Sequence, residues 1–396
     1  MAVAAVALFC ILATLSHALQ VATDSGPNQM RPCRRKADVT IPQGLVAGPP
    51  AEKSVQCNWG GVNSYFLYAL PEAQQDAILR SLQKYGLKVV RIFIDTVSKD
   101  HKDSGSFFVP HLEPDHMGQY DTTVLELINK LMVKVQLYGI KLAIALHDRY
   151  SLGCYSCDGY QKDLQLNCIA PKCSRLNDAT EFYKSNVAIE FFDKRLRMIL
   201  NYKNPLLGKR WGELKDVVAM YEIQNEAQGL DSSWVEGWHC ARANVIRSSI
   251  SSEILIGTGG GRTFASSSRL EHFYCPDIDV VTLHDYDSTS WTQMYGGILA
   301  ARDLGLTYGK KVVHEEFGRE HKLARPDYFY AVISAAVDLG VPFMPWQYVI
   351  PANNRDDDYE FDERQAAWPV LVFGVLQANA TPAAFTWSNL ELCTVA

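Results

Sequence analysis

Apolar residues along the chain gather in short solid runs, which alternate with longer segments whose apolar residues repeat with helical spacing. Typical runs are KVVRIFI at residues 88–94 and KLAIALH at residues 141–147. A solid apolar run fits a strand that is buried on both faces, as in a parallel sheet. The pattern predicts strands at residues 56–62, 87–94, 140–146, 216–224, 253–257, 278–283, 310–314 and 341–346.

An amphipathic segment follows each of these strands. The predicted helices cover residues 71–85, 121–138, 179–202, 234–250, 265–272, 291–304, 325–339 and 366–378. Eight strands that are each followed by a helix match a closed barrel. We therefore expect an α/β fold of the (β/α)8 TIM barrel class in a single domain. A doubly wound open sheet is the alternative that the same alternation allows.

The N-terminal residues 1–18, MAVAAVALFCILATLSHA, form an apolar run that ends in small residues. Ser16 and Ala18 suit cleavage by signal peptidase, and the run is shorter than the ~20 residues of a membrane-spanning helix. We expect a signal peptide at 1–18, an irregular segment at 19–54 and the folded domain at 55–396. A buried N-terminal helix or an uncleaved anchor is the alternative.

Composition narrows the choice of partners. The 396 residues are 47% hydrophobic and 21% charged, which is typical of a globular protein. The net charge of −6 and the pI near 5.9 offer no basic surface for nucleic acid. Beyond residue 18, the sequence has no stretch long and apolar enough to span a membrane. We expect a secreted, extracellular monomer without nucleic-acid or membrane partners.

The number and spacing of the cysteines indicate whether the protein works in an oxidising or a reducing compartment. Of ten cysteines, Cys10 lies in the expected signal peptide, which leaves nine. Four of them cluster in a long insertion after the third strand, residues 148–178: Cys154, Cys157, Cys168 and Cys173. Such a cluster predicts either a zinc site or, in a secreted protein, disulfides in a loop. Expected secretion favours disulfides, and the odd count predicts one free thiol or an intermolecular bond.

Polar residues stand where the apolar runs stop. A barrel carries its active site at the carboxyl ends of its strands, so these residues are candidates for the site. They are Asn63, Arg91, His147, the group Gln224, Asn225 and Glu226, the pair His284 and Tyr286, the group His314, Glu315 and Glu316, and Trp346.

The fourth and seventh strands end in carboxylates and lie on opposite sides of a barrel mouth. Glycosidic-bond cleavage requires one acid to protonate the leaving oxygen while a carboxylate attacks the anomeric carbon, at a separation of ~5–5.5 Å in retaining enzymes. The pattern predicts Glu226 as acid/base, with a raised pKa, and Glu316 as ionised nucleophile. Charge from Arg91 or a hydrogen bond from Tyr286 could keep Glu316 ionised.

The ordered motifs N-E, H-x-Y, E-F-G and Trp at successive strand ends resemble glycoside hydrolase family 5 and its wider retaining clan, over roughly residues 55–380. The resemblance implies a retaining β-glycosidase. It implies that Asn225 binds the sugar 2-hydroxyl and that Arg91 and Tyr286 position the nucleophile. It also implies that His147 and His284 line the subsite before the scissile bond, with Trp346 as a platform beneath that sugar.

The chain departs from this family pattern at two positions. Ala227 follows the acid/base where proline is frequent, and Glu315 precedes the nucleophile where glycine is frequent. Glu315 is therefore a second candidate nucleophile. The E-F-G frame favours Glu316, and strand alternation predicts that only one of the two neighbours points into the mouth.

Structural roles compete with these functional roles. Arg91 could pair with Asp95 in the barrel wall, and His147 and His284 could be satisfied core histidines. Four tryptophans could stack on sugars or only pack: Trp59, Trp234, Trp238 and Trp291. The run GTGGG at residues 257–261 looks like a phosphate loop but lacks the G-x-G-x-x-G frame.

We expect an endo-acting β-1,4-glycan hydrolase that needs no metal or cofactor. β-Mannan is the preferred polysaccharide substrate on the strength of the resemblance, and β-glucan comes next. The alternatives are an exo-acting β-glycosidase, a non-catalytic carbohydrate-binding barrel, which should lack one of the two carboxylates, and a zinc protein built on the clustered cysteines.

Overall fold

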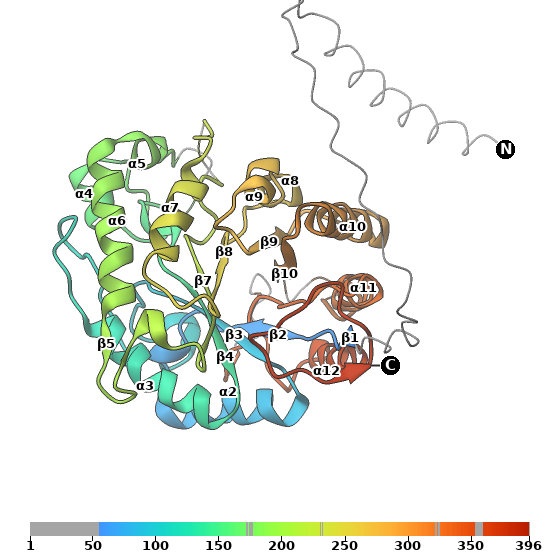
Figure 1. The fold of residues 1–396 in the computed structure, drawn as a ribbon. Coiled ribbons are helices and arrows are strands. Elements are labelled where there is room, and N and C mark those ends of the chain that lie inside the picture. Colours follow the sequence, from blue (N-terminus) through green and yellow to red (C-terminus); the bar gives the residue numbers. More distant parts are fainter. Residues whose placement is uncertain are drawn as a thin grey trace, which may run out of the picture. The chain divides into compact units, whose positions relative to one another are not determined.

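The computed structural model describes residues 55–171, 173, 177–229, 231, 233–320, 323, 325–352 and 359–395. The expected signal peptide and N-terminal segment lie outside these residues, as does Cys33. Seven parallel strands form one sheet in the order β10-β9-β8-β7-β4-β3-β2 (Figure 1). They are β2 (Gly61–Asn63), β3 (Val89–Phe93), β4 (Lys141–Ala145), β7 (Val218–Glu222), β8 (Leu255–Gly257), β9 (Val280–Asp285) and β10 (Lys311–Phe317).

The expected eighth strand at 341–346 does not form as a regular strand. Pro342 and Pro345 have no N–H to donate, which interrupts a hydrogen-bond ladder. The segment still closes the barrel, because Phe343 forms isolated bridges to both Gly60 and His314. The Gly61 N–H donates to the Phe343 carbonyl at 2.9 Å on one side, and the Met344 N–H donates to the His314 carbonyl at 2.9 Å on the other.

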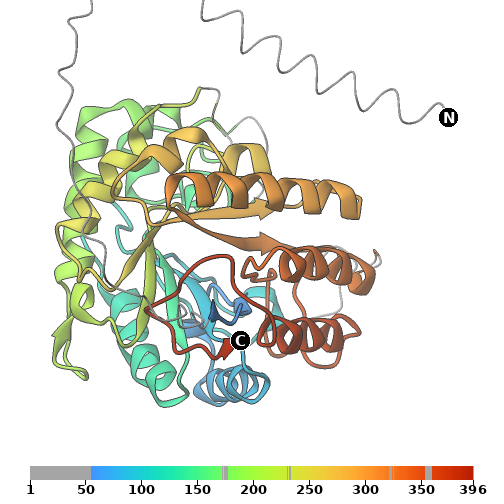
Figure 2. The same ribbon diagram turned by 45° about the vertical axis from the view of Figure 1, so that its right-hand side comes forward.

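Helices cover the outside of the strands (Figures 1 and 2). The predicted helices are found as α2 (Glu72–Tyr85), α3 (Thr123–Leu137), α7 (Trp238–Arg247), α10 (Trp291–Tyr308), α11 (Arg325–Asp338) and α12 (Ala367–Ala378). Each predicted strand is followed by helix, so the expected (β/α)8 barrel is confirmed and the open sheet is wrong.

Two predicted helices are broken. The segment 179–202 is α5 (Thr180–Lys184) and α6 (Asn186–Asn201), because Ser185 is extended and its side chain caps α6 by accepting from the Ala188 N–H. The segment 265–272 is α8 (Phe264–Ser267) and α9 (Leu270–Tyr274). The pattern missed three short features: α4 (Gly159–Asp163), the hairpin of β5 (Lys203–Asn204) and β6 (Lys209–Arg210), and the pair of β1 (Val55–Gln56) and β11 (Thr394–Val395).

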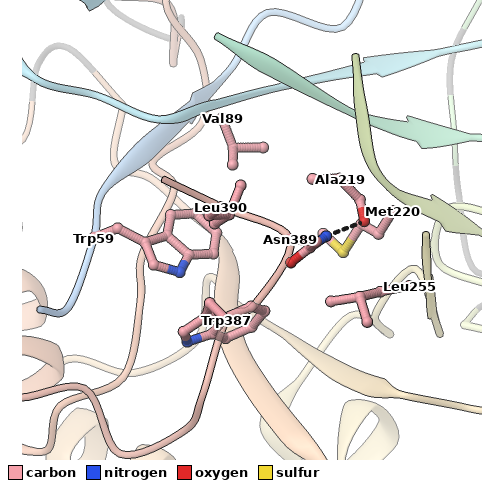
Figure 3. A pocket seen from close by; sticks show the side chains of 8 residues that line it. All are labelled: Trp59, Val89, Ala219, Met220, Leu255, Trp387, Asn389 and Leu390. Atoms are coloured by element: carbon pink, nitrogen blue, oxygen red, sulfur yellow. Dashed lines mark hydrogen bonds between the residues drawn. The ribbon is translucent and has the colours of Figure 1, made fainter. Parts of the chain in front are cut away.

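The C-terminal segment covers the amino ends of the strands, away from the candidate site (Figure 3). Trp387 packs edge-on against Trp59 with ring centroids 5.2 Å apart. The Asn389 amide donates to the Ala219 carbonyl at 2.7 Å, and a disulfide joins Cys57 to Cys393. Trp59 is therefore a packing residue at the closed end of the barrel.

The clustered cysteines form two disulfides, Cys154–Cys173 and Cys157–Cys168. Their sulfurs are thus bonded to each other, which removes the zinc-site alternative. A further disulfide joins Cys240 to Cys275. Among the described residues, no helix has both the length and the apolar character needed to cross a bilayer.

Candidate active site

Arg91 lies at the centre of the barrel mouth, fully buried on β3. Its guanidinium donates to Glu222 at 2.8 and 3.0 Å, to Asn225 at 2.9 Å and to Asn63 at 3.1 Å. It also donates to Glu316. The alternative pairing with Asp95 is not formed, since Asp95 accepts from Ser151 at 2.6 Å and lies 3.2 Å from His111. The arrangement ties the ends of β2, β3, β7 and β10 to one positive charge.

His284 on β9 joins the carboxylates across the mouth. Its Nδ1 lies 3.0 Å from Glu226 and 3.6 Å from Glu316, and its Nε2 lies 3.2 Å from Glu315. The Tyr286 hydroxyl donates to Glu316 at 3.0 Å. His284 is therefore part of an ionised cluster and not a simple core histidine.

Glu315 and Glu316 both point inward, so the prediction from strand alternation is wrong. The register of β10 against β9 shifts between His314 and Glu316, which leaves Glu315 as an extra residue in a bulge. Glu315 is fully buried and lies 3.5 Å from the Arg91 Nε. Glu316 is also buried but keeps 4% exposure, and it accepts a hydrogen bond from Tyr286.

Glu226 follows β7 on a strained turn. Its φ of 46° lies in the left-handed region, which is unfavourable for a residue with a side chain. Its N–H donates to the Gly259 carbonyl at 2.8 Å, which anchors the turn to the glycine run after β8. The Tyr150 hydroxyl donates to the Glu226 carboxylate. The turn thus aims Glu226 into the mouth, toward Glu316.

Two residues of the cluster were not predicted from the sequence. Glu222 is the only charged residue in the buried run VVAMYEIQ. A charge at a buried position needs a partner, so this position could have identified Glu222 as a candidate site residue. Tyr150 lies four residues after the end of the third predicted strand, within the insertion. No local pattern distinguishes it from the insertion's other tyrosines.

His147 and Trp346 occupy different environments. His147 is buried, with Nε2 2.8 Å from Asp158, Nδ1 2.8 Å from the Gln224 amide, and its ring stacked on Phe182. Both nitrogens are thus engaged, which favours the core-histidine alternative. Trp346 is half-buried, and its ring stacks on Tyr65 at 5.5 Å and 8°. It keeps an accessible surface at the mouth.

The remaining tryptophans also differ in burial and in packing. Trp238 is buried and stacks on Phe192 at 5.6 Å, so it packs. Trp234 stacks on the buried His239 at 5.4 Å. Trp291 begins α10 and is 45% exposed. None of the three hydrogen bonds to the Arg91 or His284 clusters among the described residues.

Proton affinities in the cluster follow from burial and charge. Burial alone would lower the pKa of His284, but the charge of Glu316 and hydrogen bonds to Glu226 and Glu315 raise it to about 10. Burial raises the pKa of Glu316, against the opposing charges of His284 and Arg91. Burial acts in the same direction on Glu226, but His284 and Tyr150 outweigh it and lower its pKa. The expected order of the two carboxyl groups is therefore reversed in this arrangement.

Glu226, His284 and Glu316 each place a potential ligand atom within 4.8 Å of the others, which is close enough to hold a metal ion. The ligand atom of His284 nearest both carboxylates is Nδ1. The charge of Glu316 and hydrogen bonds to Glu226 and Glu315 raise the pKa of this imidazole to about 10, so without a bound cation the three side chains share a proton near neutral pH. The same span places an oxygen of Glu226 within 4.8 Å of one of Glu316.

Comparisons with known proteins identify the family. Residues 50–350 match the family described as Cellulase (glycosyl hydrolase family 5). Mannan endo-1,4-beta-mannosidase 1 of Arabidopsis thaliana is 20% identical over 244 residues, which are 57% of this chain and 54% of that protein. The chain thus spans about half the length of that curated relative.

Solved structures share the fold. The endo-β-1,4-mannanase of Thermotoga petrophila superposes with a TM-score of 0.63 at 16% identity, over 82% of this chain and 77% of that chain. The endo-1,4-β-mannanase of Rhizomucor miehei gives 0.62 at 17% identity, over 83% and 97%. The family match covers most of the chain, and the site contains the carboxylates expected from the resemblance. The chain therefore belongs to glycosyl hydrolase family 5.

Proposed function

We propose that the protein is a secreted, retaining endo-β-1,4-mannan hydrolase. In this proposal Glu226 is the acid/base and Glu316 is the nucleophile. The observation that carries it is that an oxygen of Glu226 and an oxygen of Glu316 lie within 4.8 Å of each other at the mouth of the barrel. Such a close approach fits the ~5–5.5 Å between the carboxyl groups of retaining enzymes better than the ~6.5–9.5 Å that an inverting enzyme needs for its water.

The first step forms a covalent glycosyl-enzyme. A Glu316 oxygen bonds to the anomeric carbon while the bond from that carbon to the leaving oxygen breaks, and the leaving oxygen takes a proton from Glu226. In the second step Glu226 takes a proton from water, whose oxygen displaces Glu316 from the anomeric carbon. Two inversions restore the original anomeric configuration.

The surrounding groups suit these steps. Arg91 and Tyr286 bind the Glu316 carboxylate and orient it for attack. The proton for the leaving oxygen is held by the pair of His284 and Glu226, since Nδ1 lies 3.0 Å from the Glu226 carboxylate. It passes from Nδ1 to Glu226 and from Glu226 to the oxygen. This supplies an acid even though the pKa of Glu226 alone is lowered.

Sugar contacts complete the proposal. Asn225 is held by Arg91 and by Asp148, to which its amide donates at 2.9 Å, beside Glu226. We assign it to the sugar 2-hydroxyl, and Trp346 to the platform under the same sugar. The choice of mannan rests on the relatives named above, which are mannanases by description. The four disulfides among the described residues support an oxidising, extracellular location. The N-terminal sequence of chain recovered from the medium tests cleavage after Ala18.

The reaction and the sugar are tested together by product analysis. The purified protein is incubated with soluble mannan, glucomannan, carboxymethyl-cellulose, β-1,3-glucan and xylan, and products are measured by mass and reducing ends. Mannan-derived oligosaccharides of mixed length confirm the proposal. Single sugars released from chain ends indicate exo action. Products from another glycan, and none from mannan, indicate that this other glycan is the substrate. Binding to a glycan without any product indicates a non-catalytic barrel.

The assignment of the nucleophile predicts a specific rescue. Glu316→Ala should lower turnover by roughly 10⁴-fold or more, the scale of losing a nucleophile. Azide should restore activity and give a glycosyl azide of inverted configuration, because a small anion fits the vacated space and only one displacement then occurs. Product configuration is read by proton NMR.

Glu315→Ala is the control for the same experiment. It should retain measurable turnover and show no azide product, because Glu315 lies behind Arg91 and His284. Azide rescue of Glu315→Ala, with near-normal turnover of Glu316→Ala, would show that Glu315 and not Glu316 is the nucleophile.

A further inference from the structure

The insertion 148–178, which we call the Cys-rich loop, presents one tyrosine at the mouth in a fixed position. Tyr155 lies between Cys154 and Cys157, which are bonded to Cys173 and Cys168. The Gly153 N–H donates to the Ser156 carbonyl at 2.9 Å, and Leu152 forms a bridge with Cys157, so the turn is closed around Tyr155. A tyrosine held in this way loses little conformational entropy when it binds a ligand.

One face of the Tyr155 ring is occupied and the other is open. The ring stacks on Tyr150 with centroids 5.2 Å apart and planes at 24°. Tyr155 nevertheless remains 60% exposed. Exposed tyrosine is common at surfaces, but here two disulfides and a stacked partner fix an apolar ring face toward solvent. This arrangement is typical of a surface that binds a flat apolar partner.

Charged residues that follow several barrel strands lie close enough to Tyr155 to affect the pKa of its hydroxyl. Partial burial, followed by the negative charges of Asp148 and Glu226, raises the pKa of its hydroxyl, while Lys102 and Arg262 lower it. These four residues follow β3, β4, β7 and β8 in sequence. Tyr155 therefore lies within electrostatic range of loops from four consecutive strand ends and not on the outer wall.

Tyr150 connects this ring to the chemistry. Its hydroxyl donates to the Glu226 carboxylate, and its ring carries Tyr155. The acid/base stands beside the glycosidic oxygen, and that oxygen departs with the sugar on the reducing side of the broken bond. The stacked pair of Tyr150 and Tyr155 therefore begins at the carboxylate that, in the proposed function, protonates the leaving oxygen.

We propose that Tyr155, backed by Tyr150 and fixed by the Cys-rich loop, is a stacking platform for a pyranose on the leaving-group side. This inference rests on the proposed function and specifies where the enzyme draws binding energy from the polymer. The C–H face of the sugar packs on the open ring face. The Cys-rich loop therefore favours internal cleavage of chains that continue beyond the broken bond.

The test compares two substrates of the same enzyme. One is a β-1,4-linked pentasaccharide of the glycan on which the wild type is most active, and the other is the fluoride of the matching disaccharide. Fluoride leaves without any sugar on that side, so it cannot use the platform. The variants are Tyr155→Ala, Tyr155→Phe and, as a control, Tyr330→Ala, which removes an equally exposed tyrosine from α11.

Tyr155→Ala should lower kcat/KM for the pentasaccharide about three- to tenfold, mainly through KM, and leave the fluoride rate unchanged. Tyr155→Phe should retain the wild-type value, because the ring and not the hydroxyl stacks. Equal losses on both substrates would overturn the proposal, since Tyr155 would then act only by supporting Tyr150 and Glu226. A Tyr155→Ala variant that behaves like Tyr330→Ala would also overturn it. An inactive wild type would instead refute the proposed function.

Discussion

The charge balance around Arg91 and His284 depends on Glu315, the residue at which the chain departs from the family pattern. Arg91 contacts Glu222, Glu315 and Glu316, and His284 contacts Glu226, Glu315 and Glu316. Burial raises the pKa of Glu222 well above its usual value, and the nearby Glu315 adds to this. The pKa of Glu315 is instead lowered, since Arg91 and His284 outweigh its burial. Glu315 is thus a buried anion that, after Glu316 and Glu226, helps to keep His284 protonated.

Replacing Glu315 by glutamine should therefore change the pH dependence of activity. The loss of its charge lowers the pKa of His284 from about 10, while Glu226, Glu316, Arg91 and the neutral His314 still face the ring. If His284 must be protonated to supply Glu226, the alkaline limb of kcat/KM should move to lower pH by about one unit, or about 1.4 kcal/mol. The profile is measured from pH 4 to 10.

Glu190→Gln is the control, because it removes an exposed negative charge from α6, distant in sequence from the cluster. It should leave the profile unchanged. A Glu315→Gln profile that keeps the wild-type alkaline limb would show that His284 does not supply the proton.

At the scale of elements, the glycine run after β8 explains how β7 and β9 approach each other at the mouth. Gly259 and Gly260 have φ values of 84° and 69°, which side chains rarely tolerate. A Cβ on Gly259 would lie 2.0 Å from the Gln224 carbonyl, and one on Gly260 would lie 2.3 Å from the His284 ring. The run GTGGG thus serves close packing beneath His284 and Glu226.

Gly260→Ala should accordingly displace His284. We expect kcat/KM to fall at least about tenfold, together with a loss of roughly 1–2 kcal/mol of stability from the left-handed backbone. Gly296→Ala is the matched control, because Gly296 is exposed on α10 and has open space around the new Cβ. It should preserve activity and leave stability equal or slightly higher. Denaturant unfolding and kcat/KM are measured for both, and normal activity of Gly260→Ala would contradict this account of the loop.

At the scale of the whole molecule, a disulfide joins the two ends of the folded domain at the side of the barrel opposite the site. The Cys57–Cys393 disulfide closes a sequence separation of 336 residues, against 35 for Cys240–Cys275. Beside it, Trp59 and Trp387 seal the amino ends of the strands (Figure 3). The segment that closes the barrel between β10 and β2 forms only isolated bridges to its neighbours. The Cys57–Cys393 disulfide therefore restrains the least regular part of the barrel wall.

Removing each disulfide by paired serine substitution should give unequal losses. In the chain-entropy account the longer loop contributes about 2 kcal/mol more to stability. Cys57→Ser with Cys393→Ser should therefore lower the free energy of unfolding more than Cys240→Ser with Cys275→Ser, while both variants keep activity at 25 °C. Equal losses in denaturant titrations would mean that local packing and not loop closure sets the contribution.

Local patterns in the sequence were enough to predict the order of strands and helices and most residues of the site. Solid apolar runs can be buried only between two layers, and parallel strands bring their polar carboxyl ends together at one edge. Arg91, Asn225, Glu226, His284, Tyr286 and Glu316 could therefore be identified as residues of one mouth. The apolar pattern did not predict the break of the helix at Ser185 or the irregular segment around Pro342. Each of these features depends on a single residue and not on the repeat of apolar positions.

The contacts between these side chains, in contrast, become known only from the folded structure. The bulge at Glu315 overrides strand alternation, because one extra residue in β10 reverses the facing of its neighbour. The contacts of Glu222 with Arg91 and of Tyr150 with Glu226 join residues 131 and 76 positions apart. The reversed proton affinities follow from the contacts of His284 and Tyr150 with Glu226, which lower its pKa, and from the burial of Glu316, which raises its pKa. Local sequence cannot specify such effects, since they depend on distances between separate strands and on the burial that the closed barrel creates.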